Sequence, residues 1–340
     1  MRLLIWHVHG SWTTAFVQGR HTYLLPVAPG RGPDGRGRAQ TWKWPPSAVE
    51  VHGDQLRDEQ LDAVILQRPG EEELTRQLTG RRPGRDLPAI YLEHDAPGGD
   101  VPLTRHPMAD RDDLHLVHVT HFNDLFWDAG ATPVTVIEHG VVDPGPRWTG
   151  ELPRAAAVIN EPLRRGRFTG TDLLPYFAQA APLDVFGMGV RDLPGALGEP
   201  GITAHEDLPQ ARMHAELARR RLYLHPIRWT SLGLALIEAM MLGMPVVGLA
   251  TAEAAVSVPA DAGVVATDPA VLHDAVRAYR ADPDLARTHG ARGRETALRR
   301  WSVTRFCEDW DDVLATVTGS TPSRAPVGST PAAPGVAVPL

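Results

Sequence analysis

The sequence has only one cysteine, Cys307, and no long apolar run. One cysteine excludes an intramolecular disulfide framework and any all-cysteine metal site. No apolar stretch approaches the ~20 residues that a membrane-spanning helix needs, so we expect no transmembrane segment. The first residues, Met1-Arg2-Leu3-Leu4-Ile5-Trp6, do not show the charged and then apolar pattern of a secretion signal. We therefore expect a cytoplasmic protein.

Positive charge is also scarce. Lys and Arg number 34 against 41 Asp and Glu, a net charge of −7, and Lys43 is the only lysine. Such a chain has no basic field to attract nucleic acid or an anionic membrane surface, so we expect no nucleic-acid partner. The 15 histidines include close pairs such as His7 and His9, but no His-Glu-x-x-His or Cys pattern completes a zinc ligand set. We expect no metal.

Short apolar runs that alternate with helix-length segments are the main structural signal. The 340 residues are enough for two domains of ordinary size. Strands separated by helices predict parallel sheets covered by helices. We expect strands at 2–8 (stopping at a turn at Gly10), 63–66, 89–92, 114–120, 134–138, 155–159, 183–186, 221–225 and 245–249. We expect helices at 123–129, 171–181, 208–220 (capped by Asp207), 234–242, 268–281 and 301–317.

The predicted fold class is α/β, with two doubly wound, Rossmann-like domains facing a cleft. A proline-glycine linker at 143–146 divides residues 1–146 from a second domain at 147–300. Residues 319–340 are mostly Pro, Ala, Gly, Ser, Thr and Val without periodicity, which predicts a disordered tail. Sheets of this kind bind ligands at the carboxyl ends of their strands. Functional residues are therefore expected in the loops that follow strands.

The segment 225–247 is the most informative part of the sequence. It shows a strand, a loop, a helix stopped by glycine, and a second strand. The loop 229–233 would deliver free backbone N–H groups at a helix N-terminus, which is an anion site, and Gly233 lets an anion approach the backbone. Glu238 lies on an otherwise apolar helix, where burying a carboxylate is costly unless something binds it. The alternative is a solvent-facing glutamate.

The run T-S-L-G-L-A-L-I-E-A-M-M-L-G-M-P-V-V resembles the donor-binding segment of retaining GT-B glycosyltransferases, in particular glycosyltransferase family 4, which reads E-x-F-G-x-x-x-x-E-A-M-A-x-G-x-P-V. The resemblance implies that Glu238 holds the nucleotide ribose. Thr230 stands where the family has the glutamate that holds the transferred sugar. Donor phosphate and sugar would bind along Thr230, Ser231, Leu232 and Gly233.

Further residues carry the resemblance over most of the chain. Val136 to Asp143 is similar to the end of the family's first domain, and the run ending at Gly187-Met188-Gly189 is similar to its strand ending in G-x-G, which implies a donor contact at Gly187. The final helix, residues 301–318, resembles the one that returns to the first domain. The resemblance places Gly10 and Ser11 in a glycine loop near the donor phosphates.

The resemblance also implies catalytic groups. The family clamps the donor diphosphate with an arginine and a lysine, but residues 160–170 hold no lysine, and Thr169 stands in its place. The candidates are Arg164, Arg165 and Arg167, with a solvated basic loop as the alternative. His94 matches a histidine near the transferred sugar, or else is a buried structural histidine. We assign catalysis to His94, Arg164 and Arg167, and donor binding to Arg165.

The function that the resemblance implies is retaining transfer of a sugar, of the hexosyl type, from a nucleotide-diphosphate sugar to a hydroxyl acceptor. It implies no cofactor and no metal, because arginines and a helix N-terminus would carry the diphosphate charge. Two alternatives stay open. One is a sugar-nucleotide 2-epimerase of the same fold, and the other is a non-catalytic scaffold that binds nucleotide-sugar.

Overall fold

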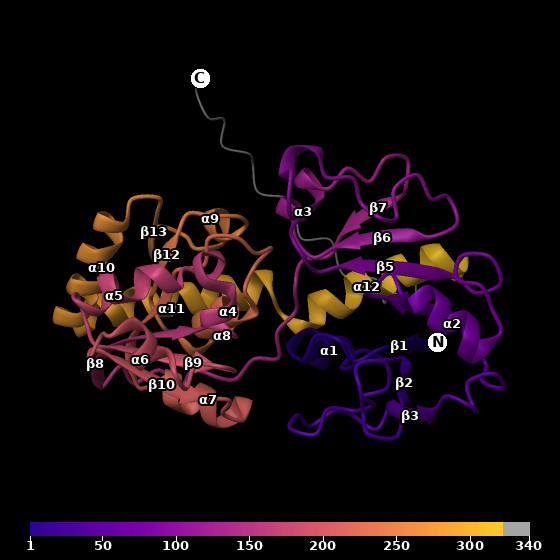
Figure 1. Cartoon of the computed structure of the whole chain (residues 1–340), viewed down its shortest axis with the longest axis horizontal. Coiled ribbons are helices and arrows are strands. Elements are labelled where there is room, and N and C mark those ends of the chain that lie inside the picture. The colour runs from indigo at the N-terminus through magenta and orange to yellow at the C-terminus, as the bar shows by residue number, and fades with distance from the viewer. Residues whose placement is uncertain (322–340) are drawn as a thin grey trace, which may run out of the picture.

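A computed structural model describes residues 1–321 and shows two parallel β-sheets, each flanked by helices (Figure 1). The first sheet has seven strands in the order β3-β2-β1-β4-β5-β6-β7, and the second has six in the order β10-β9-β8-β11-β12-β13. The last strand of the first sheet ends at Val136 and the first strand of the second begins at Leu152. The predicted class, two doubly wound α/β domains, is confirmed.

The first sheet is formed from short, mostly buried strands. They are β1 (Arg2–Ile5), β2 (Thr22–Val27), β3 (Ala48–His52), β4 (Ala63–Leu66), β5 (Ala89–Glu93), β6 (His115–His118) and β7 (Val134–Val136). The helices between them are α1 (Gly10–Phe16), α2 (Glu71–Thr79), η1 (Val101–Leu103) and α3 (His121–Phe126).

The second sheet consists of β8 (Leu152–Val158), β9 (Leu183–Gly187), β10 (Ile202–Glu206), β11 (Arg220–His225), β12 (Val246–Leu249) and β13 (Gly263–Ala266). Its helices are α4 (Pro162–Arg165), η2 (Gly166–Thr169), η3 (Thr171–Leu173), α5 (Leu174–Ala178), α6 (Leu193–Leu197), α7 (Gln210–Leu217), α8 (Leu234–Leu242), α9 (Ala254–Ser257), α10 (Pro269–Ala281) and α11 (Pro283–Arg300). The last helix is α12 (Val303–Thr318).

Two local predictions were wrong. The chain does not turn at Gly10: α1 begins there, with His9 as its N-cap residue. Asp207 does not cap the following helix, because α7 begins only at Gln210 and its N-cap residue, Pro209, makes no side-chain cap hydrogen bond. Asp207 instead has a φ of 41°, in the left-handed region, at a sharp bend after β10. This bend directs residues 207–210 toward the space between the domains.

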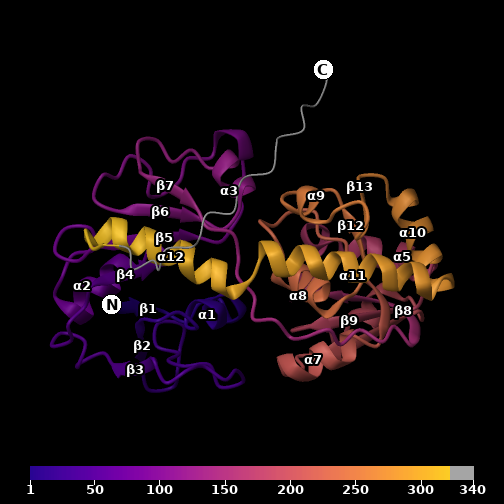
Figure 2. The ribbon, with the colours of Figure 1, turned by 180° about the vertical axis from the view of Figure 1, so that it is seen from behind.

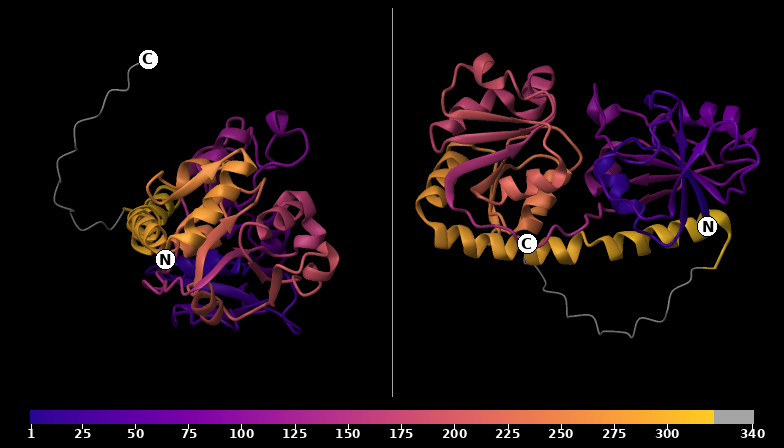
Figure 3. Two further views of the ribbon diagram at one scale, coloured as in Figure 1. Left: turned by 90° about the vertical axis from the view of Figure 1, so that its left-hand side faces the viewer. Right: turned by 90° about the horizontal axis from the view of Figure 1, so that it is seen from below.

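The helix α12 completes the core of the first domain although it comes last in the chain. Figures 2 and 3 show α11 and α12 running one after the other along one side of both domains. Phe306 and Trp310 of α12 are buried against Trp12 and Phe16 of α1, with ring centroids 4.8 Å apart for Phe16 and Trp310. Residues 322–340, which make up nearly all of the predicted disordered tail, lie outside the described residues.

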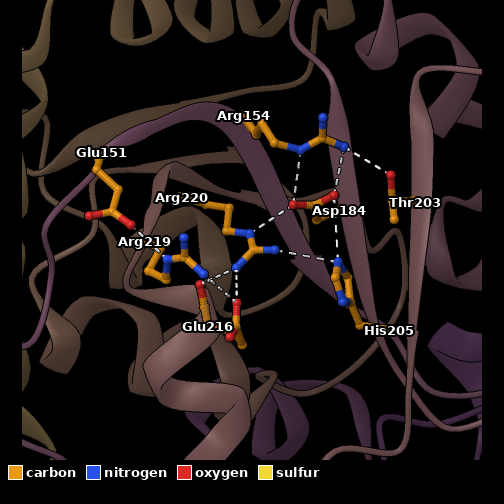
Figure 4. A network of polar contacts seen from close by, with 8 residues as sticks. All are labelled: Glu151, Arg154, Asp184, Thr203, His205, Glu216, Arg219 and Arg220. Carbon is orange, nitrogen blue, oxygen red and sulfur yellow. Dashed lines mark hydrogen bonds and ion pairs between the residues drawn. The ribbon is translucent and has the colours of Figure 1, made fainter.

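A buried ion-pair network fixes the amino-terminal half of the second sheet (Figure 4). The side chain of Asp184 on β9 is 2% exposed and accepts from Arg154 (2.7 Å) and from Arg220 (2.7 Å). Burial disfavours the charged form of Asp184, but the two guanidinium groups outweigh it, so the pKa of the carboxyl is lowered. The network lies near the strand starts, away from the carboxyl ends where the parallel strands would meet a ligand.

Candidate active site

A cavity of about 550 Å³ opens between the two domains, at the carboxyl ends of strands from both sheets. The first domain contributes its wall from the start of α1 and from the loop between β2 and β3. The second domain contributes the loops after β8, β9, β10 and β11, and the start of α8. The lining residues used below are His9, Gly10, Ser11, Trp42, Arg165, Thr169, Gly187, Gln210, His225, Thr230, Gly233 and Glu238.

The N-terminus of α8 faces this cavity. Gly233 is its N-cap residue, and no side chain among residues 1–321 caps the helix. The first backbone N–H groups of a helix lack intrahelical partners, and the helix dipole places partial positive charge there. Both Thr230 and Gly233 line the cavity. The geometry therefore offers an anion-binding position where the sequence predicts donor phosphate.

Glu238 lies one turn inside α8, and its carboxylate is not in solvent. The residue is 3% exposed and lines the cavity. Its Oε1 accepts a hydrogen bond from Gln210 Nε2 at 2.9 Å, and its Oε2 lies 3.1 Å from His214 Nε2. The solvent-facing alternative for Glu238 is wrong, because α8 is buried along nearly its whole length.

Of the three candidate arginines, the structure brings one into the cavity. Arg165 lines it, half-buried, and burial lowers the pKa of its guanidinium while Asp95 of the first domain opposes that shift. Arginine stays charged at neutral pH even so. The side chains of Arg164 and Arg167 are 72% and 76% exposed and pair with Glu161 and Asp172. Neither of these two lines the cavity.

Thr169, which stands where the resembled family has a lysine, also lines the cavity. Thr169 is buried there, with its hydroxyl 3.1 Å from the Gly166 carbonyl and 3.0 Å from Thr171 Oγ1. It carries no charge. Arg165 is thus the cationic side chain that the structure provides in this wall of the cavity.

His94 lies behind the cavity wall and not in it. Its Nε2 lies 3.0 Å from Gln67 Oε1, and burial, followed by the neighbouring His9 and His139, holds the pKa of His94 well below its ordinary value. His9 lies in front: it is exposed, lines the cavity, and its ring centroid is 4.0 Å from that of His94. The structural alternative for His94 therefore fits its contacts, and His9 is the histidine that a ligand would meet.

Two residues of the expected donor loop have other contacts: Ser231 joins the two domains, and Leu232 packs within the second. The hydroxyl of Ser231 donates to the backbone carbonyl of His94 at 2.7 Å. Leu232 is 4% exposed and packs in an apolar cluster with α8. Neither lines the cavity, whereas the predicted Gly10, Ser11 and Gly187 do. Gly187 has a φ of 143°, and a Cβ there would lie 2.2 Å from the Ile159 carbonyl oxygen.

Several cavity residues were not predicted from the sequence, among them His9, Gln210, His225 and Trp42. His225 ends β11, is 1% exposed, and both its ring nitrogens lack a partner among the described residues. Burial lowers the pKa of His225 to about 4, so the ring is neutral at pH 7. Its place at the carboxyl end of a predicted strand was a signal that could have found it. Trp42 lies in the long loop between β2 and β3, where no sequence pattern predicts a functional residue. Its indole packs against Gly10.

Comparisons with known proteins agree with this architecture. The chain is similar in structure to the sucrose-phosphate synthase of Thermosynechococcus elongatus, with 13% identity, a TM-score of 0.69, and coverage of 94% of this chain and 99% of that one. It is also similar to the HepE protein of Anabaena, solved with UDP and glucose, with 13% identity, a TM-score of 0.66, and coverage of 93% and 100%. A glycosyltransferase of Rickettsia africae is similar as well, with 11% identity, a TM-score of 0.67, and coverage of 94% of this chain and 99% of that one. The chain thus has the GT-B fold of two facing Rossmann-like domains.

At the level of sequence, residues 167–312 match the model of the glycosyl transferase-like family. The matched span contains α8 and most of the second domain, including Glu238. No curated protein matches the chain significantly in sequence. Within residues 1–321, no group of three or more His, Cys, Asp or Glu side chains could hold a metal ion. No helix of the same residues has both the length and the apolar character to span a membrane.

Proposed function

We propose that the protein is a glycosyltransferase that moves a sugar from a nucleoside diphosphate sugar to a hydroxyl acceptor. The observation that carries this proposal is the pairing of the open α8 N-terminus with the buried carboxylate of Glu238 in one cavity. Two further findings support it: the family match over residues 167–312, and the similarity in fold to HepE, which was solved with UDP and glucose.

In this proposal each part of the donor meets a different group. Glu238 accepts hydrogen bonds from the ribose hydroxyls, and the backbone N–H groups of Gly233 and of the first residues of α8 bind the diphosphate. Arg165 faces the leaving diphosphate, whose negative charge grows as the sugar departs, so its attraction is stronger in the transition state than in the ground state. The proposal thus assigns the contact with the leaving diphosphate to Arg165 and no longer to Arg164 and Arg167.

The sequence resemblance adds the finer features of the proposal. We propose that transfer retains the anomeric configuration, as in glycosyltransferase family 4, without a metal, and that the leaving phosphate accepts the proton of the acceptor hydroxyl. The first domain would present the acceptor, with His9 facing it and His94 supporting the His9 ring from behind. A hexosyl donor and a cytoplasmic location stay predictions from the sequence.

Thermal shifts with UDP-, GDP-, ADP- and TDP-sugars test the proposal. A ligand present at 100 times its dissociation constant stabilises the folded state by about 2.7 kcal/mol, enough to raise the melting temperature measurably. The binding sugar nucleotide should lose affinity at least tenfold in Glu238→Ala, because a hydrogen bond to a charged group contributes about 1.5–3 kcal/mol. Absence of any shift across the panel would contradict the proposal. Binding without release of nucleoside diphosphate over a set of sugar acceptors would favour the non-catalytic scaffold.

A further inference from the structure

Two side chains of α7 hold the carboxylate of Glu238, one at each oxygen. Gln210 donates from Nε2 to Oε1 at 2.9 Å, and Nε2 of His214 is 3.1 Å from Oε2. An ionised carboxylate only accepts hydrogen bonds, so the His214 nitrogen that faces it is the one that carries hydrogen. Glu238 is 3% exposed and His214 is 6% exposed, so water does not compete freely for either bond.

The two donors differ in their access to the cavity. They are four residues apart on α7 and therefore lie on one face of that helix. Gln210 lines the cavity beside Glu238, whereas His214 does not line it and reaches the carboxylate from behind. A carboxylate oxygen has about two acceptor positions. With one position on each oxygen taken by α7, one on each remains for a ligand.

We propose that His214 and Gln210 are positioning residues that fix Glu238 as a two-point acceptor for adjacent ribose hydroxyls. The inference rests on the proposed function and deepens it. Two fixed acceptors match the 2′- and 3′-hydroxyls of a ribonucleoside diphosphate, each donating to a different oxygen. A 2′-deoxynucleotide leaves one acceptor position of a buried charge empty, so the site selects against it. Thymidine diphosphate, which lacks the 2′-hydroxyl, should therefore bind weakly.

The test measures affinities for UDP, GDP and ADP, each beside its 2′-deoxy counterpart, by calorimetry on the full chain. The unmodified protein should prefer the ribonucleotide by about 10–100-fold, the range for a hydrogen bond to a charged group. In His214→Leu this preference should fall to within about threefold of unity, mainly because the ribonucleotide binds more weakly. His214→Gln should retain most of the preference for the ribonucleotide, since the amide nitrogen of the glutamine can replace the ring nitrogen as donor.

Matched variants separate positioning from general damage. His289→Leu removes a histidine of α11 whose ring lies 2.7 Å from the Tyr279 hydroxyl, and it should leave the preference unchanged. If His214→Leu does not fold, Gln210→Met tests the other donor in the same way. An unchanged ribose preference in the folded α7 variants would overturn the inference, as would equal binding of both sugars by the unmodified protein. Failure of every ribonucleotide to bind would instead overturn the proposed function.

Discussion

At the scale of single residues, one side chain of residues 160–170, that of Arg165, brings positive charge to the cavity. Arg165 is held in the cavity wall, with its guanidinium 5.3 Å from the centre of the Phe168 ring. Its neighbours Arg164 and Arg167 are exposed and paired with carboxylates. Three arginines within four residues thus have different surroundings, and only the structure distinguishes them.

Arg165→Ala should therefore reduce turnover by about 10²–10³, the usual effect of removing one transition-state donor. Affinity for the donor should fall less, because the negative charge on the diphosphate is larger in the transition state than in the bound donor. Arg164→Ala and Arg167→Ala serve as matched controls and should retain turnover within about threefold, since exposed ion pairs contribute little. Steady-state rates and calorimetric donor affinities, measured for each variant, check that turnover falls more than affinity. Equal losses in all three variants would contradict the assignment.

At the scale of elements, most of the predicted helices and strands show a clear apolar pattern, but β2 was missed although its sequence is the apolar run T-Y-L-L-P-V. The helix α8 was predicted at its observed bounds, because apolar residues fill it between two glycines. The helix α11 was missed although it is 18 residues long. This helix packs so closely on α8 that a Cβ at Gly290 would lie 2.0 Å from the Gly243 carbonyl oxygen. Its buried residues are therefore small: Ala286, Gly290, Gly293 and Ala297. Small residues at an interface leave no hydrophobic period to detect.

The candidate site shows the same limit. Glu238, Thr230 and Gly233 were predicted because they lie in one contiguous segment with a recognisable order. His214 and Gln210 were not, since their role depends on how α7 packs against α8. Trp42 reaches the cavity from a loop that lacks periodicity. Contacts between elements distant in sequence could not be predicted from local patterns.

The strand β9 carries a buried charge, the carboxylate of Asp184. Asp184→Asn should lower the free energy of unfolding by about 1.5–3 kcal/mol, because Arg220, which is 6% exposed, loses a charged hydrogen-bond partner and keeps only its ion pair with Glu216. Urea unfolding followed by circular dichroism checks this value. Asp274→Asn, at a side chain 83% exposed, is the control and should change stability by less than about 0.5 kcal/mol.

The same carboxylate predicts a pH dependence. The pKa of Asp184 is lowered in the folded protein, so its contribution to stability is present above its unfolded pKa and is lost as pH falls through the folded value. The difference in unfolding free energy between the original protein and Asp184→Asn should therefore be constant from about pH 5 to 7 and shrink below about pH 4. A difference that does not shrink in acid would show that Asp184 is not the group that titrates.

At the scale of the whole molecule, two sets of contacts join the domains. Ser231 and Trp229 of the second domain donate to the carbonyls of His94 and Pro97 at 2.7 and 2.9 Å. Arg300 at the end of α11 binds Glu253 at 2.8 Å and also pairs with Glu138 of the segment that follows the first sheet. The cavity walls are thereby held in register by residues that do not line it.

The final helix makes the first domain depend on the far end of the chain. Trp310 of α12 is 2% exposed, and its ring centroid lies 5.6 Å from Trp12 and 4.8 Å from Phe16. Trp310→Ala should lower the free energy of unfolding by about 3–5 kcal/mol, because it opens a large cavity in a core that α1 and α12 build together. Leu298→Ala on α11, where the leucine is 37% exposed, is the control and should cost much less. Urea unfolding of both variants checks the comparison. A loss below about 1 kcal/mol in Trp310→Ala would mean that the first domain keeps its core without α12.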